Sequence, residues 1–346
     1  MRGLTVAAML VVNDAGDWDH VHPWLEHSAW NGCTFADYIF PFFLFIVGVS
    51  ITLALDVQLA RGGSPRVIAR KIVWRGARIV LLGLALAAFE WWVVPSAHAY
   101  RPMGVLQRIG VCYTAGGLIA LYVRDARIQW AFVAIVLLGY WAALSAYGPL
   151  LPGANLADHV DSAILGQHAY IYDPATGQGR DPEGLLSTLP AIVTVILGIR
   201  AGDWLRLQRM RPLLQFGVVS MVVAAVWVVV FPINKQLWTS TFVLWTGGVA
   251  TLTLAFAHKG FDIWGWPPFG RSLGINAITA YAGAWVAVCI LEGTGAMRPL
   301  YNSVFVASFG PPLPAWVPSL VFAVAFTAVF WLTIRLLTRK GWRITI

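Results

Sequence analysis

Long apolar stretches, separated by short basic or Gly/Pro-containing segments, run through most of this chain of 346 residues. Hydrophobic residues make up 58% of the sequence and charged residues only 12%, about half the charged share of soluble domains. A water-soluble domain of this size cannot bury so much apolar surface. The sequence therefore predicts a polytopic membrane protein, and it excludes a disordered chain, a disulfide scaffold and a soluble enzyme.

Ten apolar stretches have the composition of membrane-spanning helices, which need about 20 mostly apolar residues. The predicted fold class is all-α, a single membrane domain over 1–346, with 148–183 as an extracytoplasmic loop. The first stretch gives only about 16 Å of helix, about half the hydrocarbon core. Either residues upstream of Met1 are missing or Asn13 lies near mid-membrane. The predicted spans are 3–13, 35–55, 74–94, 104–122, 130–147, 184–200, 213–231, 237–257, 275–291 and 316–337.

Charged residues are distributed unequally between the two sides of this topology. With the N-terminus in the cytoplasm, 19 of the 24 Lys and Arg residues fall on the inner side, and 12 of the 16 Asp and Glu residues fall on the outer side. Short cytoplasmic loops carry such an excess of Lys and Arg. The distribution predicts cytoplasmic termini in an inner (cytoplasmic) membrane, and it explains the net charge of +8 without a nucleic-acid-binding surface.

Polar side chains at the span ends gather on the predicted outer side. Polar groups at membrane depth are costly and commonly functional, although residues at helix ends can also simply face water. Three histidines in the loop 14–34 suggest a metal site, but no HExxH or CxxC motif accompanies them, and we expect no metal. The residues concerned are Asn13, Asp37, Gln107, Arg108, Asp181, Glu183, Asn234 and Lys235, with His20, His22 and His27 in the loop.

Arginines at the predicted inner edge are candidates for binding phosphate groups. Arg75 and Arg78 are three residues apart on one helical face, and Arg271 and Asn276 lie near the inner end of the ninth span. Retention of basic residues in the cytoplasm is the alternative for this basic segment, and it is the explanation that we prefer for the neighbouring Arg70 and Lys71. An anion site inside and a histidine site outside suit an enzyme that passes a group across the membrane. A membrane transporter of a sugar or organic anion is the alternative.

The chain resembles the heparan-α-glucosaminide N-acetyltransferase family of transmembrane acyltransferases over nearly its whole length, most specifically in its first 55 residues. The resemblance implies acetyl transfer from cytoplasmic acetyl-CoA, as co-substrate, to the amine of a terminal sugar on the other side. It further implies an amino-sugar or oligosaccharide acceptor, the lipid bilayer as surroundings and no nucleic-acid partner, and it leaves a homodimer open. The matching segments are RGLTVAAMLVVNDAG, HSAWNGCTFADYIFPFFLFIVGVSI, KIVWRGARI, GVLQRIGVCY, DPEGLLSTLPAI, INKQLWTSTFV and INAITAYAG.

The same resemblance implies roles for individual residues. His27 matches the catalytic histidine of the family, and Asn13 matches the family's asparagine at the end of the first span. We expect His27 to act as a general base or as an acetylated intermediate. With His27 as the base, we expect Asn13 to stabilise the oxyanion and Asp37, or another carboxylate of the loop, to orient His27. We also expect a polar tunnel that is open near Arg75 and closed near His27. The sequence Gly283-Ala284-Trp285 departs from the lysosomal enzymes and leaves the acceptor open. The expected acetyl-CoA ligands are Arg75, Arg78, Arg271 and Asn276, and the expected acceptor ligands are Trp30, Asn31, Gln107, Arg108, Asp181, Glu183, Asn234, Lys235 and Trp238.

Overall fold

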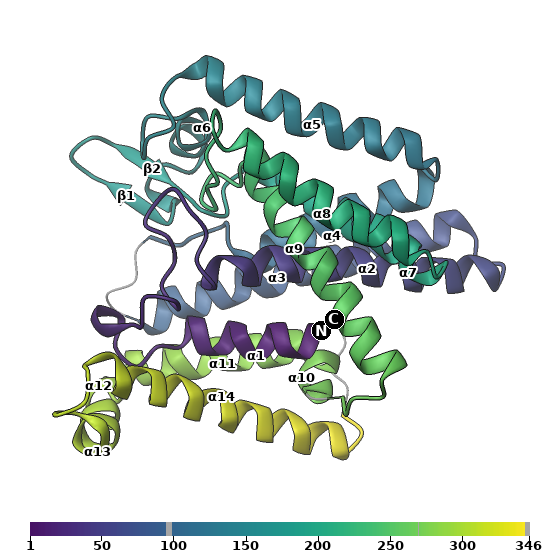
Figure 1. Cartoon of the computed structure of the whole chain (residues 1–346). Helices are drawn as coiled ribbons and strands as arrows, with labels where there is room; N and C mark the ends of the chain where they lie inside the picture. The colour runs from purple at the N-terminus through teal and green to yellow at the C-terminus, as the bar shows by residue number, and fades with distance from the viewer. Residues whose placement is uncertain (95–98, 269, 343–346) are drawn as a thin grey trace.

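The computed structural model describes residues 1–94, 99–268 and 270–342, which form a bundle of antiparallel helices (Figure 1). The long helices are α1 (Arg2–Asn13), α2 (Ile39–Ala60), α3 (Pro65–Val93), α4 (Val105–Tyr122), α5 (Ala126–Tyr147), α7 (Thr188–Arg206), α8 (Met210–Trp227), α9 (Ser240–Ala257), α11 (Ala277–Gly293) and α14 (Trp316–Arg339). The shorter elements are α6 (Leu156–Leu165), β1 (Ile171–Asp173), β2 (Gln178–Arg180), α10 (Arg271–Ile275), α12 (Met297–Leu300) and α13 (Ala307–Phe309).

The helices fall on the ten predicted ranges, which confirms the all-α, multi-pass fold. In the part of the chain that the structure describes, eight helices are long and apolar enough to span a membrane. The helix α11 and the segment Met297–Phe309, bent by 96° against each other, make a ninth span at most, and α1 is a shorter apolar helix of 12 residues. The third helix begins at Pro65 rather than at 74, because proline is favoured in the first turn of a helix.

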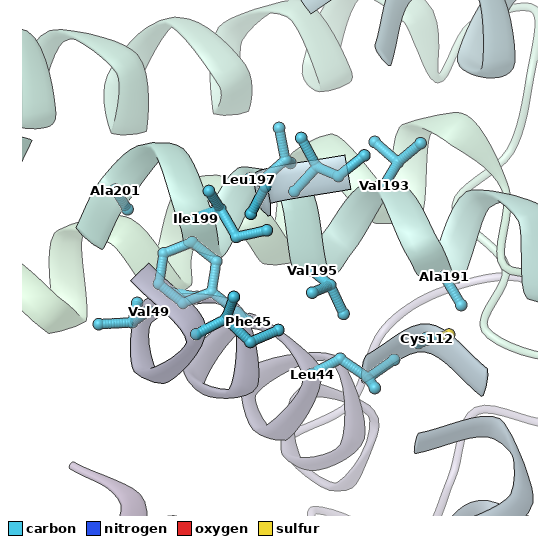
Figure 2. Close-up of a cluster of buried hydrophobic side chains, with 14 of the residues drawn as sticks. Leu44, Phe45, Val49, Cys112, Ala191, Val193, Val195, Leu197, Ile199 and Ala201 are labelled. Carbon is cyan, nitrogen blue, oxygen red and sulfur yellow. The ribbon is translucent and has the colours of Figure 1, made fainter. Parts of the chain in front are cut away.

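The centre of the bundle is the contact between α2 and α7, whose side chains fill the cluster in Figure 2. Glycines allow the two backbones to approach closely: a Cβ added to Gly48 would lie 2.0 Å from the Val195 carbonyl oxygen, and one added to Gly198 would lie 2.0 Å from that of Phe45. Small residues are enriched at such contacts because helices in lipid associate mainly by close packing. We therefore expect α2 and α7 to form the rigid frame that positions the site.

Other helices lie at the periphery of the bundle. Only 17% of the most apolar window of α14 and 22% of that of α8 is buried inside the protein, against 61% for the span that contains α2 and 67% for α7. Apolar side chains that are not buried by protein are the ones that a bilayer covers. The helix α14, the outermost one at the lower edge of Figure 1, therefore presents most of its surface to lipid.

The predicted loop 148–183 contains structure that we did not anticipate. The helix α6 begins after Asn155, whose side-chain oxygen accepts a hydrogen bond from the backbone N–H of Asp158 at 2.9 Å, a typical N-cap. The strands β1 and β2 then form a short antiparallel hairpin, with Ile171 opposite Arg180. We call the end of the bundle that carries this hairpin the hairpin end.

Asp161, on α6, makes the stability of the hairpin end depend on pH. Its side chain is buried, one oxygen accepts the Leu185 N–H at 2.8 Å, and burial raises its pKa to about 6. Between pH 4 and 6 the unfolded chain ionises this carboxyl before the folded protein does, so stability falls as pH rises through that window. We expect Asp161→Asn, which keeps the acceptor oxygen, to raise the free energy of unfolding at pH 7.5 by at most about 3 kcal/mol. The apparent Tm should therefore rise at pH 7.5 and stay unchanged at pH 4.

Thermal unfolding at the two pH values checks this, with Glu292→Gln at an exposed carboxylate as the control. An equal change at both pH values would show that the variant acts through packing rather than through ionisation.

Candidate active site

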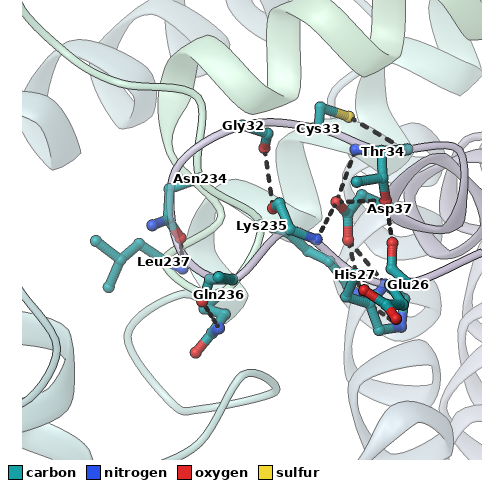
Figure 3. A network of polar contacts seen from close by, with 12 residues as sticks. Glu26, His27, Gly32, Cys33, Thr34, Asp37, Asn234, Lys235, Gln236 and Leu237 are labelled. Carbon is teal, nitrogen blue, oxygen red and sulfur yellow. Dashed lines mark hydrogen bonds and ion pairs between the residues drawn. The ribbon is translucent and has the colours of Figure 1, made fainter. Parts of the chain in front are cut away.

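Asp37 organises the end of the loop that joins α1 to α2. Its side chain is 0% exposed, and one carboxylate oxygen accepts hydrogen bonds from the N–H of Ser28 at 3.1 Å, the N–H of Thr34 at 2.9 Å and the Thr34 hydroxyl at 3.1 Å. Gly32, at a φ of 120°, donates its N–H to the Ile233 carbonyl at 2.8 Å. The loop is thereby folded around a buried carboxylate and held against the connection between α8 and α9 (Figure 3).

His27 is oriented by the other oxygen of Asp37. Its Nδ1 lies 2.8 Å from Asp37 Oδ1. Because an ionised carboxylate can only accept, we assign the proton to Nδ1, and Nε2 keeps its lone pair. The His27 side chain is 45% exposed. The pair therefore presents a basic, accessible imidazole nitrogen, which is the arrangement of a general base or a nucleophile.

Lys235, from the connection between α8 and α9, reaches the same pair. Its Nζ lies 3.0 Å from Nδ1 and 3.1 Å from Nε2 of His27, and 3.6 Å from Asp37 Oδ1. Asn234 supports it: its side-chain oxygen accepts the Leu237 N–H at 2.9 Å. Burial lowers the pKa of Lys235, while the carboxylates of Asp37 and Glu183 act in the opposite direction. A buried amine thus stands beside the basic nitrogen of His27.

A cavity of about 110 Å³ lies next to His27. We call it the outer cavity; it is lined by residues of α1, α2, α4 and α11 and by the loops of the hairpin end. Most of its wall is apolar. The polar side chains that line it are Asn13, His27, Glu183, Lys235 and Tyr281. The expected catalytic residues Asn13 and His27 therefore face one space.

An ion-pair network holds Glu183 at this cavity. Arg101 Nη2 lies 2.5 Å from Asp181 Oδ1 and 2.6 Å from Glu183 Oε2, and its guanidinium lies over the Tyr170 ring at 4.4 Å. Burial alone would raise the pKa of Glu183, but the cations of Arg101, Arg108 and Lys235 outweigh it and lower that pKa. The cavity wall thus carries a fixed negative charge. Sequence reasoning did not single out Arg101; its only signal was a basic residue on a mostly acidic side.

A second cavity of about 110 Å³, the inner cavity, lies toward the opposite end of the bundle, the end with the connection from α2 to α3. We call this the basic end. Arg2, Ser50, Arg75 and Tyr113 line the cavity, and the Arg75 guanidinium lies 5.3 Å from the centre of the Tyr113 ring. The two cavities are neighbours inside the bundle, since four apolar residues line both: Phe43, Ile109, Ala277 and Ile278.

The sequence of the chain, including the residues around these cavities, is similar to that of known proteins. The family model described as "Heparan-alpha-glucosaminide N-acetyltransferase, catalytic" matches residues 1–214. The chain belongs to this family. It is 28% identical to the heparan-alpha-glucosaminide N-acetyltransferases of Mus musculus and Homo sapiens, over 82% of this chain and 52% and 51% of those proteins. The chain spans about half the length of these curated relatives. The matched range contains Asn13, His27 and Asp37.

Several residues that we expected to contact the acceptor are instead buried supports in this family member. Arg108 and Trp238 are 0% and 1% exposed; Arg108 Nη2 donates to the Gly184 carbonyl at 2.9 Å, and its guanidinium lies 5.2 Å from the Trp238 ring centre. They brace the segment before α7 and do not line the outer cavity. Of the nine expected acceptor ligands, Glu183 and Lys235 line it; those that do not are Trp30, Asn31, Gln107, Arg108, Asp181, Asn234 and Trp238.

Trp30 and Asn31 fasten the loop that carries His27. Trp30 Nε1 donates to the Leu150 carbonyl at 2.7 Å, and Asn234 Nδ2 donates to Asn31 Oδ1 at 3.2 Å. These contacts link the loop between α1 and α2 to two connections that are distant in sequence. A sequence motif cannot distinguish such positioning contacts from ligand contacts, since both require polar side chains.

The four expected acetyl-CoA ligands do not gather in one place. Arg75 lines the inner cavity, whereas Arg271 lines a separate groove and Arg78 is exposed and lines neither. Asn276 donates through Nδ2 to Thr338 Oγ1 at 3.0 Å. Arg78 lies about 60° around the helix from Arg75, since three residues turn an α-helix by about 300°. Because of that offset, the Arg78 side chain does not reach the inner cavity that Arg75 lines.

The structure also bears on the expected tunnel and on the histidines of the loop 14–34. The expected closure near His27 is wrong, because its side chain is 45% exposed, and the region between the cavities is apolar rather than polar. His20 pairs with Asp17 at 2.9 Å and His22 packs against Trp316 at 4.6 Å between ring centres. Over 1–94, 99–268 and 270–342, no three His, Cys, Asp or Glu side chains form a group able to hold a metal.

Proposed function

We propose that this protein is a transmembrane acetyltransferase that moves an acetyl group from acetyl-CoA to the amine, or hydroxyl, of a sugar. The observation that carries the proposal is the pair of cavities with shared walls, one lined by Arg75 and the other by His27 with Asp37 behind it. The name of the relatives specifies a glucosamine acceptor, and we propose an amino sugar or oligosaccharide for this chain. We place the basic end in the cytoplasm and the protein in the inner membrane.

In the first mechanism, donor and acceptor are bound together. The Nε2 atom of His27 takes a proton from the acceptor ammonium, and the freed nitrogen lone pair attacks the thioester carbonyl. The C–N bond forms and the C–S bond breaks. The CoA thiolate leaves and takes up the second proton, which the attacking nitrogen loses, and the proton held by His27 Nε2 passes to solvent. Asn13 donates a hydrogen bond to the developing oxyanion, and Asp37 stabilises the imidazolium. The acceptor nitrogen must come within hydrogen-bond distance of His27 Nε2, and the Lys235 amine lies 3.1 Å from that atom. We therefore propose that the acceptor amine binds next to Lys235.

In the second mechanism, Nε2 of His27 itself attacks the thioester, the C–S bond breaks and CoA leaves as the thiol, so that His27 carries the acetyl group as acetyl-imidazole. The acceptor amine then attacks this acetyl group, loses its proton to solvent and releases the free imidazole. Incubation of the protein with labelled acetyl-CoA, without acceptor, separates the two. Label on the wild type that is absent from His27→Ala supports the covalent route, and release of thiol only when acceptor is added supports the ternary complex.

We propose that the donor phosphates bind at Arg2 and Arg75, with the pantetheine arm extending through the apolar region toward His27. Arg75→Gln should raise KM for acetyl-CoA about tenfold, because it removes one charge-assisted hydrogen bond to phosphate, and should leave kcat within about twofold. Arg66→Gln, at an exposed arginine of the same helix, is the matched control. An unchanged KM in Arg75→Gln would move the donor site elsewhere.

The proposed activity itself is tested with purified protein, acetyl-CoA and a panel of amino sugars, with detection of free thiol. Acetylated product and thiol in equal amounts support the acetyltransferase. Sugar uptake into vesicles, with no product and no stabilisation by CoA or acetyl-CoA, would instead identify a transporter.

A further inference from the structure

A groove at the basic end has no role in the acetyl-transfer scheme above. It lies between the last turns of α14 and the segment that leads into α10, and its volume of about 570 Å³ is several times that of either cavity. Arg271, Arg335 and Arg339 line it, together with Trp331, Pro267 and Ile275. The groove therefore combines three guanidinium groups with apolar surface.

The three arginines differ from other arginines of the protein in their charge partners. Within the residues that the structure describes, none of them forms an ion pair, whereas Arg101 and Arg200 pair with Asp or Glu at 2.5 to 2.8 Å. Clustered charges of one sign create a potential that attracts a counter-ion. The planar guanidinium donates two parallel hydrogen bonds and so matches the oxygens of a phosphate. The groove thus selects for a phosphate-bearing anion.

The surroundings of the groove favour a lipid as the source of that phosphate. Trp331, Arg335, Thr338 and Arg339 follow one face of α14, and the Arg335 guanidinium lies 5.2 Å from the centre of the Trp331 ring. The most apolar window of this helix is only 17% buried by protein, and the helix has no charged residue before Arg335. Tryptophan and arginine at such a border are typical of the membrane–water interface. Acyl chains along α14 would bring a headgroup to these arginines.

We propose that this groove binds the phosphodiester of an anionic phospholipid such as phosphatidylglycerol, with its acyl chains along α14. The inner leaflet would supply it, since anionic lipids attract basic segments there. The nucleotide phosphates of acetyl-CoA offer the same chemistry from another source, and the test below separates the two. The proposal requires no acetyl transfer and stands or fails apart from the proposed function.

The test compares Arg335→Gln/Arg339→Gln with the matched control Arg66→Gln/Arg70→Gln, which removes the same charge at exposed positions of the same end. Binding of phosphatidylglycerol and phosphatidylcholine to the purified full chain in detergent is measured by native mass spectrometry. At about 1 kcal/mol for each arginine, the groove variant should bind phosphatidylglycerol about 30-fold more weakly. The control should change less than about threefold, and phosphatidylcholine should bind weakly to every protein.

Three results would overturn the proposal: equal loss in both double variants, no loss in the groove variant, or displacement of bound phosphatidylglycerol by 3′-phospho-ADP, which would assign the groove to the donor nucleotide. Size-exclusion profiles and apparent Tm without added lipid show whether the variants are folded. Arg335→Lys/Arg339→Lys keeps the charge and should retain most of the binding, so a folding defect in the glutamine variant does not leave the question undecided.

Discussion

Replacement of His27 by alanine should lower kcat/KM for acetyl transfer about 10³-fold. Asp37 orients this imidazole, which lines the outer cavity, and general-base catalysis contributes about 10² to 10⁴-fold. The protein should stay folded, because the side chain is 45% exposed and fills no core position. Initial rates with varied acetyl-CoA and acceptor measure the loss.

His20→Ala is the matched control for this substitution. His20 is a histidine of the same loop that also pairs with an aspartate, Asp17, at 2.9 Å, but it does not line the outer cavity. Its activity should stay within about twofold of the wild type. Full activity of His27→Ala would refute the proposed site, whereas an equal loss in both variants would indicate a disturbed loop.

Asp37→Asn should lower kcat by about 10² to 10⁴-fold with a much smaller change in the KM for acetyl-CoA. An amide N–H can donate a hydrogen bond to the His27 Nδ1 lone pair, which favours the tautomer with its proton on Nε2, and a neutral amide cannot stabilise the imidazolium. The variant is nearly isosteric, but the same side chain accepts the N–H groups of Ser28 and Thr34, so some loss of stability is also expected.

Thr34→Val separates these two effects. It removes the hydroxyl that lies 3.1 Å from Asp37 Oδ2 and 2.6 Å from the Glu26 carbonyl oxygen, and it leaves the contact of Asp37 with His27 in place. The valine variant should lose stability and keep its activity within about tenfold. Comparable losses of activity in both variants would indicate that Asp37 acts only through the loop fold. In the double variant Asp37→Asn/His27→Ala the losses should not add, since the two residues act as one unit.

The sequence alone was enough to predict that most of this chain lies in lipid and where its helices are. Each of the ten apolar ranges became a helix, because in lipid the backbone must satisfy its hydrogen bonds within the segment. The local segment from the end of α1 to the start of α2 also carried enough information to name Asn13, His27 and Asp37. These three lie within one segment of 25 residues, so a contiguous sequence motif is enough to identify them together.

Only the tertiary structure decided which distant polar groups join that motif. Lys235 meets His27 across 208 positions of sequence, and Arg101 reaches Glu183 across 82. Arg108 is, like Lys235, a polar residue near the outer end of a predicted span, yet its side chain is fully buried and does not line the outer cavity. Hydropathy and motif spacing report on one helix at a time, whereas the side chains that share a cavity depend on how helices rotate and pack against one another. That packing also placed Arg75 and Arg271, which the sequence had grouped, on two separate surfaces.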